Sequence, residues 1–180
     1  FAFAALKEDG TVVTWGHNLY GGDNSSIVFP NKGVKQIFGN KYAFAALMND
    51  GSVISWGSPE WGGDRSSVES ELQSGVINIA STYQAFAALK DDGSIVTWGD
   101  PTQGGNSDSV SLSLSSGVTE IHSTGSSFAA LKSDGSVVSW GDPEKGGETS
   151  SVSNYLSEGV FGLANPDTDD WRIPLANAEP

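Results

Sequence analysis

Few residues in this sequence combine the type and spacing that catalysis requires. The only histidines are His17 and His122. Serines and aspartates lie near both, and these three residue types form the Ser-His-Asp site of many hydrolases. Neither histidine recurs in the other copies of the repeat described below, and such neighbours are expected by chance in a Ser-rich chain. No phosphate-binding loop, dinucleotide-binding fingerprint or zinc-ligand spacing occurs either. We therefore predict a protein that is not an enzyme, has no catalytic residues and uses no cofactor.

Aspartates are the candidates for cation binding. Asp167, Asp169 and Asp170 lie together near the end of the sequence, and Ca²⁺ in proteins is bound by several oxygen ligands. Their spacing matches no known calcium loop, so we favour a solvated acidic turn, and cation binding by this segment stays open. The pair Asp91-Asp92 is interpreted as part of a turn, because Asp92 begins an Asp-Gly step that recurs in every copy of the repeat. The sequence thus predicts no metal site.

Aromatic residues at positions that vary between copies are the candidates for binding. The loop after Trp-Gly carries Tyr20 in the first copy and Trp61 in the second, and the turn before Phe-Ala-Ala-Leu carries Tyr42 and Tyr83. Tyr and Trp often anchor interfaces, and loops on a rigid scaffold are where binding usually resides. We predict that these residues bind a protein or a glycan. The alternative is that the loops have drifted without selection and that their aromatic side chains cap neighbouring strands.

These loops are spaced by a fourteen-residue phrase that occurs four times. The copies are Phe3–Gly16 (FAALKEDGTVVTWG), Phe44–Gly57 (FAALMNDGSVISWG), Phe86–Gly99 (FAALKDDGSIVTWG) and Phe128–Gly141 (FAALKSDGSVVSWG). Their starts are 41 or 42 residues apart. A fixed period in this range is typical of propellers, solenoids and similar arrays.

Each copy of the phrase predicts a β-hairpin. In Phe128–Leu131 both faces of an alternating strand are apolar, so the strand should be covered on both sides. Asp134-Gly135 predicts a tight turn, because Gly adopts positive φ at little cost. The β-branched run that ends at Trp140 predicts the second strand. This tryptophan keeps its position in every copy, so we interpret it as a wedge between adjacent units rather than as part of a sugar-stacking ladder.

The remainder of each repeat is longer and looser. A Gly-Gly step follows the variable loop, and then a Ser-rich segment with apolar residues such as Val152 and Leu156, four apart. This spacing permits one helical turn, and a loop or a short irregular strand remains equally open. A Gly-Val-x-x-Ile strand then leads into the next phrase. The sequence therefore predicts an all-β fold with three to four short antiparallel strands in each unit of about 42 residues.

The succession Gly-Val-x-x-Ile and Ala-Leu-x-x-Asp-Gly-x-Val-x-x-Trp-Gly resembles the repeat of the regulator of chromosome condensation family, which builds β-propellers. The short period and the Ser-rich stretch also resemble the bacterial propeller-type β-lactamase inhibitors and tandem repeat proteins of marine microbes. The resemblance covers nearly all of Phe3–Leu163 and implies propeller-type blades. Family repeats often place a His before the Ala-Leu strand, where this sequence has Ala43-Phe44 or Ser127-Phe128. Nucleotide-exchange members act through an inserted wedge that this sequence lacks, so the resemblance carries no chromatin or GTPase function.

We expect residues 1–164 to form one array of four repeats, at about 3–43, 44–85, 86–127 and 128–164. The first repeat lacks a Gly-Val-x-x-Ile strand, and a spare one follows the last repeat at Gly159–Leu163. A small closed four-bladed ring, a partial propeller, or a ring shared or linked head to tail between chains would each explain this. We favour an incomplete array or one completed by a partner. Residues 165–180 are an acidic, Pro-containing tail in which Trp171, Ile173 and Leu175 alternate like a strand and are predicted to dock on the last blade or on a neighbour.

The charge balance restricts the partners. With 9 Lys and Arg against 22 Asp and Glu, the formal net charge is −13, so no nucleic acid partner is expected, because phosphate binding needs clustered cations. Solubility, a cationic partner or salty surroundings would each explain the acidity. No apolar run reaches the ~18 residues of a membrane span, and the sequence has no cysteine.

The location and function follow as expectations. The sequence opens inside a repeat with Phe1-Ala2 and shows no signal peptide, so we expect a processed or truncated chain and favour an extracellular or cell-surface location. The predicted function is a non-enzymatic protein- or glycan-binding propeller module or accessory subunit that uses its inter-strand loops. The alternative is a purely structural array that serves as a spacer or as a peripheral subunit of a larger assembly.

Overall fold

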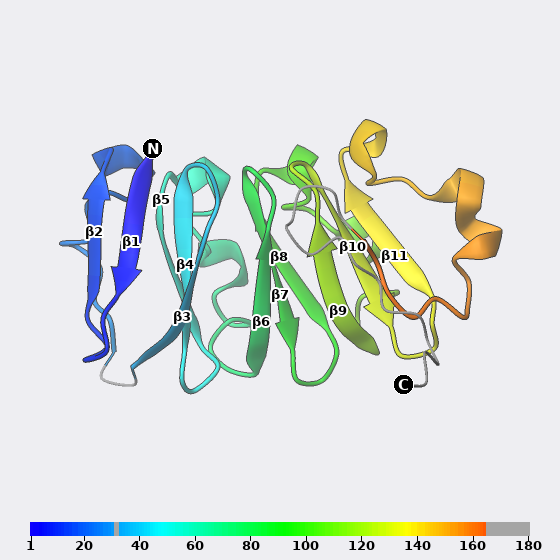
Figure 1. Cartoon of the computed structure of the whole chain (residues 1–180), viewed down its shortest axis with the longest axis horizontal. Helices are drawn as coiled ribbons and strands as arrows, with labels where there is room; N and C mark the ends of the chain where they lie inside the picture. Colours follow the sequence, from blue (N-terminus) through cyan, green and yellow to red (C-terminus); the bar gives the residue numbers. More distant parts are fainter. Residues whose placement is uncertain (31–32, 165–180) are drawn as a thin grey trace, which may run out of the picture.

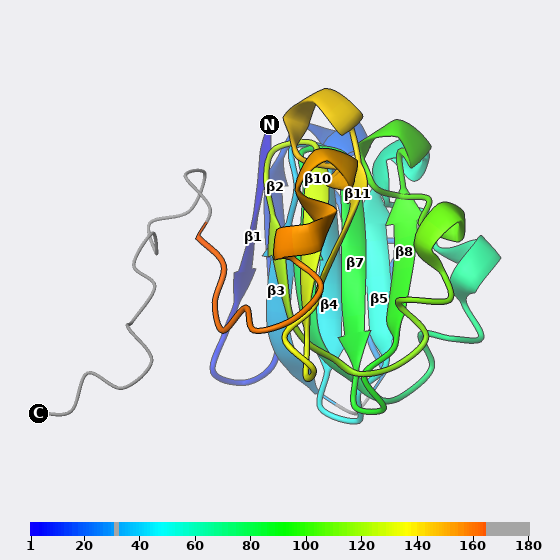
Figure 2. The same ribbon diagram turned by 90° about the vertical axis from the view of Figure 1, so that its right-hand side faces the viewer.

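A computed structural model describes residues 1–30 and 33–164, which form eleven short β-strands and seven 3₁₀-helical turns. Every strand pair is antiparallel, which confirms the predicted all-β class. The strands form four sheets that stand side by side in chain order (Figure 1) and lie one behind another when the view is turned by 90° (Figure 2). We call these sheets blades 1 to 4.

Blade 1 has two strands, and the other three blades have three strands each. Blade 1 consists of β1 (Ala2–Leu6) and β2 (Val12–Gly16), and blade 2 of β3 (Val34–Gly39), β4 (Ala43–Met48) and β5 (Val53–Gly57). Blade 3 consists of β6 (Val76–Ser81), β7 (Ala85–Lys90) and β8 (Ile95–Gly99), and blade 4 of β9 (Val118–Ser123), β10 (Ser127–Lys132) and β11 (Val137–Gly141). Each complete blade thus joins a Gly-Val strand to the hairpin of the phrase that follows it.

The Asp-Gly steps form the hairpin turns, as predicted. In blade 4, Gly135 has φ +77 and its N–H donates to the carbonyl oxygen of Lys132 over 2.9 Å. The carboxylate of Asp134 accepts hydrogen bonds from the backbone N–H (2.9 Å) and the hydroxyl (2.6 Å) of Ser136. The Asp side chain therefore closes the turn, and the Gly supplies the left-handed backbone that the turn needs.

The carboxylate at the first turn should titrate at unusually low pH. Asp9 accepts hydrogen bonds from the Lys7 ammonium (2.9 Å) and the Thr11 N–H (2.9 Å), and these lower its pKa from 3.8 to about 2. Because the pKa is lowered in the folded state, the contribution to stability is present above the ordinary pKa and is lost as the pH falls through about 2. We expect a carboxyl NMR titration to place Asp9 near 2 and the Lys7→Met variant to titrate closer to the ordinary value. Equal values near 4 in both proteins would contradict this turn geometry.

Both faces of the central strands are buried between blades. On β7, Ala85, Ala87 and Leu89 join an apolar cluster with blade 4, whereas Phe86 and Ala88 join the cluster with blade 2. The alanines leave little side chain between the sheets, so the sheets approach closely. The prediction that this strand is covered on both sides is confirmed for β7. In β10 only Phe128 and Ala130 join a cluster with another blade, and in β1 Phe3 is exposed.

Each blade docks on the preceding one through its Phe and Trp. In blade 3, the Phe86 and Trp98 rings stack with centroids 5.3 Å apart. The indole N–H of Trp98 donates to the carbonyl oxygen of Gly62 in the preceding blade over 3.0 Å. Blades 2 and 4 repeat this bond, from Trp56 to Gly21 (3.2 Å) and from Trp140 to Gly104 (3.0 Å). These tryptophans are therefore wedges between blades, as predicted.

The first Gly of each Gly-Gly step makes room for that contact. Gly104 has φ +95, and a Cβ on it would lie 2.5 Å from the Phe128 ring of the next blade. Any side chain there would push the two blades apart. Glycine is thus required both for the backbone conformation and for the close approach.

Three expectations need correction or completion. The Ser-rich segments, which could have held a fourth strand, instead form the 3₁₀ turns η3 (Ser66–Val68), η5 (Asp108–Val110) and η7 (Ser150–Tyr155), so each complete blade has three strands. Gly159–Leu163 is not a strand, because none of the described residues supplies a hairpin for it to pair with. The described array is open, so the four-bladed ring closed within one chain is wrong (Figure 1).

Two further points concern the rest of the chain. The expectations for the tail, namely a solvated acidic turn at Asp167–Asp170 with cation binding left open and docking of Trp171, lie outside the described residues. None of the helical turns in the described part has the length and apolar character needed to cross a membrane.

Candidate binding surface

The two variable positions predicted from the sequence come together in each blade. One is the second residue before the repeated Phe, and the other is the fifth residue after the repeated Trp. The pairs are Phe1 with Tyr20, Tyr42 with Trp61, Gln84 with Gln103, and Ser126 with Lys145. We call the surface formed by these eight residues, together with Lys41 and Tyr83, the loop face.

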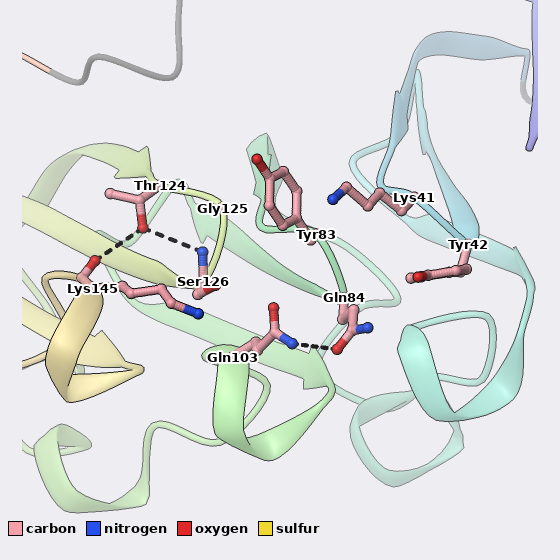
Figure 3. Close-up of a pocket in the computed structure, with 9 residues that line it drawn as sticks. All are labelled: Lys41, Tyr42, Tyr83, Gln84, Gln103, Thr124, Gly125, Ser126 and Lys145. Carbon is pink, nitrogen blue, oxygen red and sulfur yellow. Dashed lines mark hydrogen bonds between the residues drawn. The ribbon is translucent and has the colours of Figure 1, made fainter.

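The geometry of these pairs changes along the array. The rings of Phe1 and Tyr20 lie 5.3 Å apart, and those of Tyr42 and Trp61 lie 4.2 Å apart. In blade 3 the side-chain amide of Gln103 donates to that of Gln84 (Figure 3). In blade 4, Ser126 and Lys145 line the same hollow. The loop face therefore changes from aromatic at blades 1 and 2 to polar and cationic at blade 4.

One residue per complete blade fixes the distance between the two loops. The Asn40 carboxamide oxygen accepts hydrogen bonds from the N–H groups of Tyr42 (2.8 Å) and Ala43 (2.7 Å). Its amide group donates to the carbonyl oxygen of Trp61 over 2.7 Å. The hydroxyl groups of Thr82 and Thr124 make the same connections in blades 3 and 4. These residues are positioning residues that hold the loop face rigid.

Three of the four predicted binding residues form one aromatic cluster. Tyr20 lies 5.1 Å from Tyr42 and 6.1 Å from Trp61, measured between ring centroids, and the His17 ring stacks on it at 4.4 Å. The side chains of Tyr20, Tyr42 and Trp61 are half-buried, and Phe1 at the edge of the cluster is exposed. The rings of the cluster are thus packed against one another, and part of their surface is accessible to a partner.

The fourth predicted residue, Tyr83, stands apart from this cluster. Its ring lies under the Lys41 ammonium, whose nitrogen is 3.3 Å from the ring centroid, a cation–π contact. On its other side, a Cβ on Gly125 would lie 2.5 Å from the Tyr83 ring, so glycine is needed there. Figure 3 shows Lys41 and Tyr83 facing each other beside the hollow.

A hollow of about 470 Å³ lies between Tyr42 and Lys145 (Figure 3). It is lined by Lys41, Tyr42, Tyr83, Gln84, Gln103, Thr124, Gly125, Ser126 and Lys145. None of these lining residues is acidic, although the whole protein carries a net charge of −13. The hollow therefore offers hydrogen-bond donors and positive charge next to aromatic rings, which suits a ligand with carboxylate or carbonyl oxygens.

The two histidines of the sequence lie in different blades, His17 directly after β2 and His122 within β9. No group of three or more His, Asp or Glu residues in the part of the chain that the structure describes could hold a metal ion. His122 Nε2 lies 3.1 Å from a carboxylate oxygen of Glu120, and His17 stacks on Tyr20. Each histidine thus contacts a neighbouring side chain of its own blade.

Sequence reasoning missed part of this surface. Phe1 and Gln84 occupy the repeat position of Tyr42, and Gln103 and Lys145 occupy that of Tyr20 and Trp61, but they were not selected because they are not Tyr or Trp. The positioning residues were missed as well. Their signal is the recurrence of Asn40, Thr82 and Thr124 four residues before the repeated Phe.

Comparison with known proteins supports the fold. No family model matches this sequence, and neither does any curated protein. Solved structures do match. They include yeast Prp20 (RCC1) bound to Kap60, with 19% identity and a TM-score of 0.53, and human WBSCR16, with 21% identity and a TM-score of 0.52. The ectodomain of the receptor kinase CR4 from Physcomitrella patens matches with 18% identity and a TM-score of 0.55.

The matches are partial on both sides. They cover 77–78% of this chain but only 40% of Prp20, 44% of WBSCR16 and 38% of the CR4 ectodomain, so the chain spans less than half the length of these proteins. At identities near 20%, the similarity shows the fold alone. The chain is an open, four-blade section of a β-propeller built from repeats like those of RCC1.

Proposed function

We propose that this chain is a non-enzymatic, protein-binding propeller module that recognises its partner through the loop face. The observation that carries the proposal is the gathering of Tyr20, Tyr42 and Trp61 into one accessible cluster by loops that vary between blades. Aromatic residues on a rigid scaffold have the composition of interface hot spots. The loop face is built from positions that vary between blades, whereas the repeated Phe and Trp of blades 2 to 4 are used in packing.

Two further observations support a protein as the partner. The hollow beside the cluster adds the ammonium groups of Lys41 and Lys145 and the amides of two glutamines, which can bind backbone carbonyls and carboxylate side chains. Prp20, whose structure matches, binds Kap60, Gsp1p and histones. Those partners belong to Prp20, and they support protein binding here only by analogy of fold.

The test is a selection of peptides from a random displayed library, in parallel with a glycan array, followed by affinity measurements on variants. We expect peptides with acidic and apolar residues to bind the chain, and a Tyr42→Ala/Trp61→Ala double variant to bind them at least ~30-fold more weakly, as for hot-spot residues. Leu112→Ala, which removes an exposed apolar side chain elsewhere, is the control and should bind as the native chain does.

Three outcomes would contradict the proposal. If the selected peptides bind all variants with equal affinity, the loop face is not the binding site. Hits confined to the glycan array would replace the protein partner with a carbohydrate. If neither the peptide library nor the glycan array yields a binder, a purely structural role is favoured. The mutual packing of Tyr42 and Trp61 also fits that role.

A further inference from the structure

The Phe–Trp pair of blade 1 has no blade to pack against among the described residues. Phe3 and Trp15 stack with centroids 5.4 Å apart and an interplanar angle of 22°, as Phe86 and Trp98 do at 5.3 Å and 24°. Yet Phe3 is 65% exposed and Trp15 is 51% exposed, against 0% for Phe86 and 2% for Trp98. Blade 1 thus presents, ready-formed, the pair that the internal interfaces bury.

In the part of the chain that the structure describes, no Phe–Trp pair fills the matching site at blade 4. Gly146 has the same left-handed backbone (φ +100) as Gly104 (φ +95), but Gly146 is exposed and Gly104 is buried. A Cβ on Gly146 would meet only the Ser127 hydroxyl, at 3.2 Å, where one on Gly104 meets the Phe128 ring. A cavity of about 110 Å³ lies beside it, and Ser127, Ala129 and Gly146 line it together with Leu163 and Ala164 of the same chain. We call this site the Gly146 socket.

The two ends of the described array differ from the internal blades in their strand pairing. Among residues 1–30 and 33–164, β1 pairs only with β2, whereas β4 pairs on its second edge with β3. At the other end, the Val160 N–H donates to the carbonyl oxygen of Gly135 over 3.0 Å. The Val118 N–H makes the same bond to Gly93 at the start of β9, also over 3.0 Å. Residues 160–164 therefore begin where a Gly-Val strand begins, without a hairpin to pair with.

We propose that the two ends bind each other between copies of this chain, head to tail. The Phe3–Trp15 pair of one copy fills the Gly146 socket of a second copy, and the Trp15 indole N–H donates to the Gly146 carbonyl oxygen. Residues 160–164 of the second copy then add to the open edge of β1, a β-augmentation. The register of blade 2, where Ile37 lies opposite Ala46, places Leu163 opposite Ala5.

The repeated contacts identify a second copy as the occupant. In each internal interface, the Phe–Trp pair of one blade fills the site beside the Gly-Gly step that follows the preceding blade. The Gly-Val strand that comes after this step in the sequence belongs to the blade that carries the pair. The two ends of this chain carry the two halves of that arrangement. Two copies would supply eight blade positions, which lies within the ~4–8 blades of known propellers, so a closed dimer is expected. The proposal is independent of what the loop face binds.

The test is sedimentation velocity of the 180-residue chain over a wide range of concentration. We expect a shift from monomer to dimer, or to longer chains if the ring does not close, because either form requires the head-to-tail contact. Added salt should strengthen the association, since each copy carries a net charge of −13 and screening weakens their repulsion. Trp15 fluorescence should shift to shorter wavelength as the dimer forms.

Two variants separate head-to-tail binding from other modes. Phe3→Ala/Trp15→Ala removes the exposed pair, and Gly146→Asn fills the socket with a residue that tolerates positive φ. Each should weaken self-association at least ~100-fold, as for loss of a central hot spot. Leu112→Ala should associate as the native chain does. A mixture of the two defective variants should form a dimer, because each keeps one intact end.

Three results would overturn the proposal. The native chain could stay monomeric at every concentration, in which case the Phe3–Trp15 pair does not bind a second copy. The Gly146→Asn variant could associate like the native chain, as expected for contact between two N-terminal faces. The mixture of defective variants could remain monomeric while far-UV circular dichroism shows both to be folded.

Discussion

Replacing Phe86 with alanine is expected to lower the free energy of unfolding by about 3–5 kcal/mol, as for other large-to-small changes in a packed core. Phe86 is fully buried between blades 2 and 3, stacks on Trp98 and occupies the space left by Gly62. Its removal would open a cavity that the two sheets cannot close without moving together. Urea unfolding followed by circular dichroism measures the effect, read as a change in midpoint with the slope checked for loss of two-state behaviour.

The same substitution at the first copy of the phrase is the matched control. Phe3 occupies the equivalent position but is exposed and contacts mainly Trp15. At a concentration where the chain is monomeric, Phe3→Ala should cost about 1 kcal/mol or less, the value of a stacked aromatic pair. Equal losses at Phe86 and Phe3 would mean that the phrase acts within its own hairpin and not between blades.

Replacing Gly104 with alanine should destabilise the fold more than replacing Gly146. Both glycines have φ near +100, so both variants carry the backbone strain of a left-handed alanine, about 1–2 kcal/mol. Only at Gly104 does the new Cβ also collide with the buried Phe128 ring, and overpacking of this kind costs about 1–3 kcal/mol more. Chemical unfolding of both variants under dilute conditions measures the difference.

This pair of variants isolates the contact between blades from the conformation of the loop. If Gly104→Ala and Gly146→Ala lose the same stability, glycine is required there only for its backbone conformation. The close approach of Phe128 to the Gly-Gly step would then contribute nothing measurable, and the socket inferred at Gly146 would lose its basis.

The sequence made the packing contacts predictable because they repeat. Phe86 and Trp98 hold the same positions in every copy, and a contact that recurs between identical units must recur in the sequence. The Asp-Gly turn was predictable for a local reason, since its conformation depends on two adjacent residues. These features determine the hairpins, and through them the order of the blades.

The strand at Gly159–Leu163 could not be judged from its own residues. Its Gly-Val start matches the other copies, and it even keeps the hydrogen bond from Val160 to Gly135. A β-strand exists, however, only when a neighbour accepts its hydrogen bonds, and the described chain offers none at that end. The expectation failed because a local pattern was used to predict a non-local pairing.

The loop face was only partly predictable for a similar reason. The variable positions could be identified by comparing copies, but the contact between Tyr42 and Trp61 joins residues on either side of a whole hairpin. That distance is set by the hairpin length and by the hydrogen bonds of Asn40. A pattern of single residues does not reveal which loops are tied together.

Hydrogen exchange of the tryptophan indole N–H groups tests the central claim most directly, namely that each blade docks through its Trp and that blade 1 is left open. In a dilute ¹⁵N-labelled sample, we predict slow exchange for Trp56, Trp98 and Trp140, which donate to glycine carbonyls of the preceding blade. Trp15 should exchange quickly in the same sample and become protected as the concentration rises. Protection of Trp15 equal to that of Trp98 at every dilution, or fast exchange at Trp98, would contradict the account.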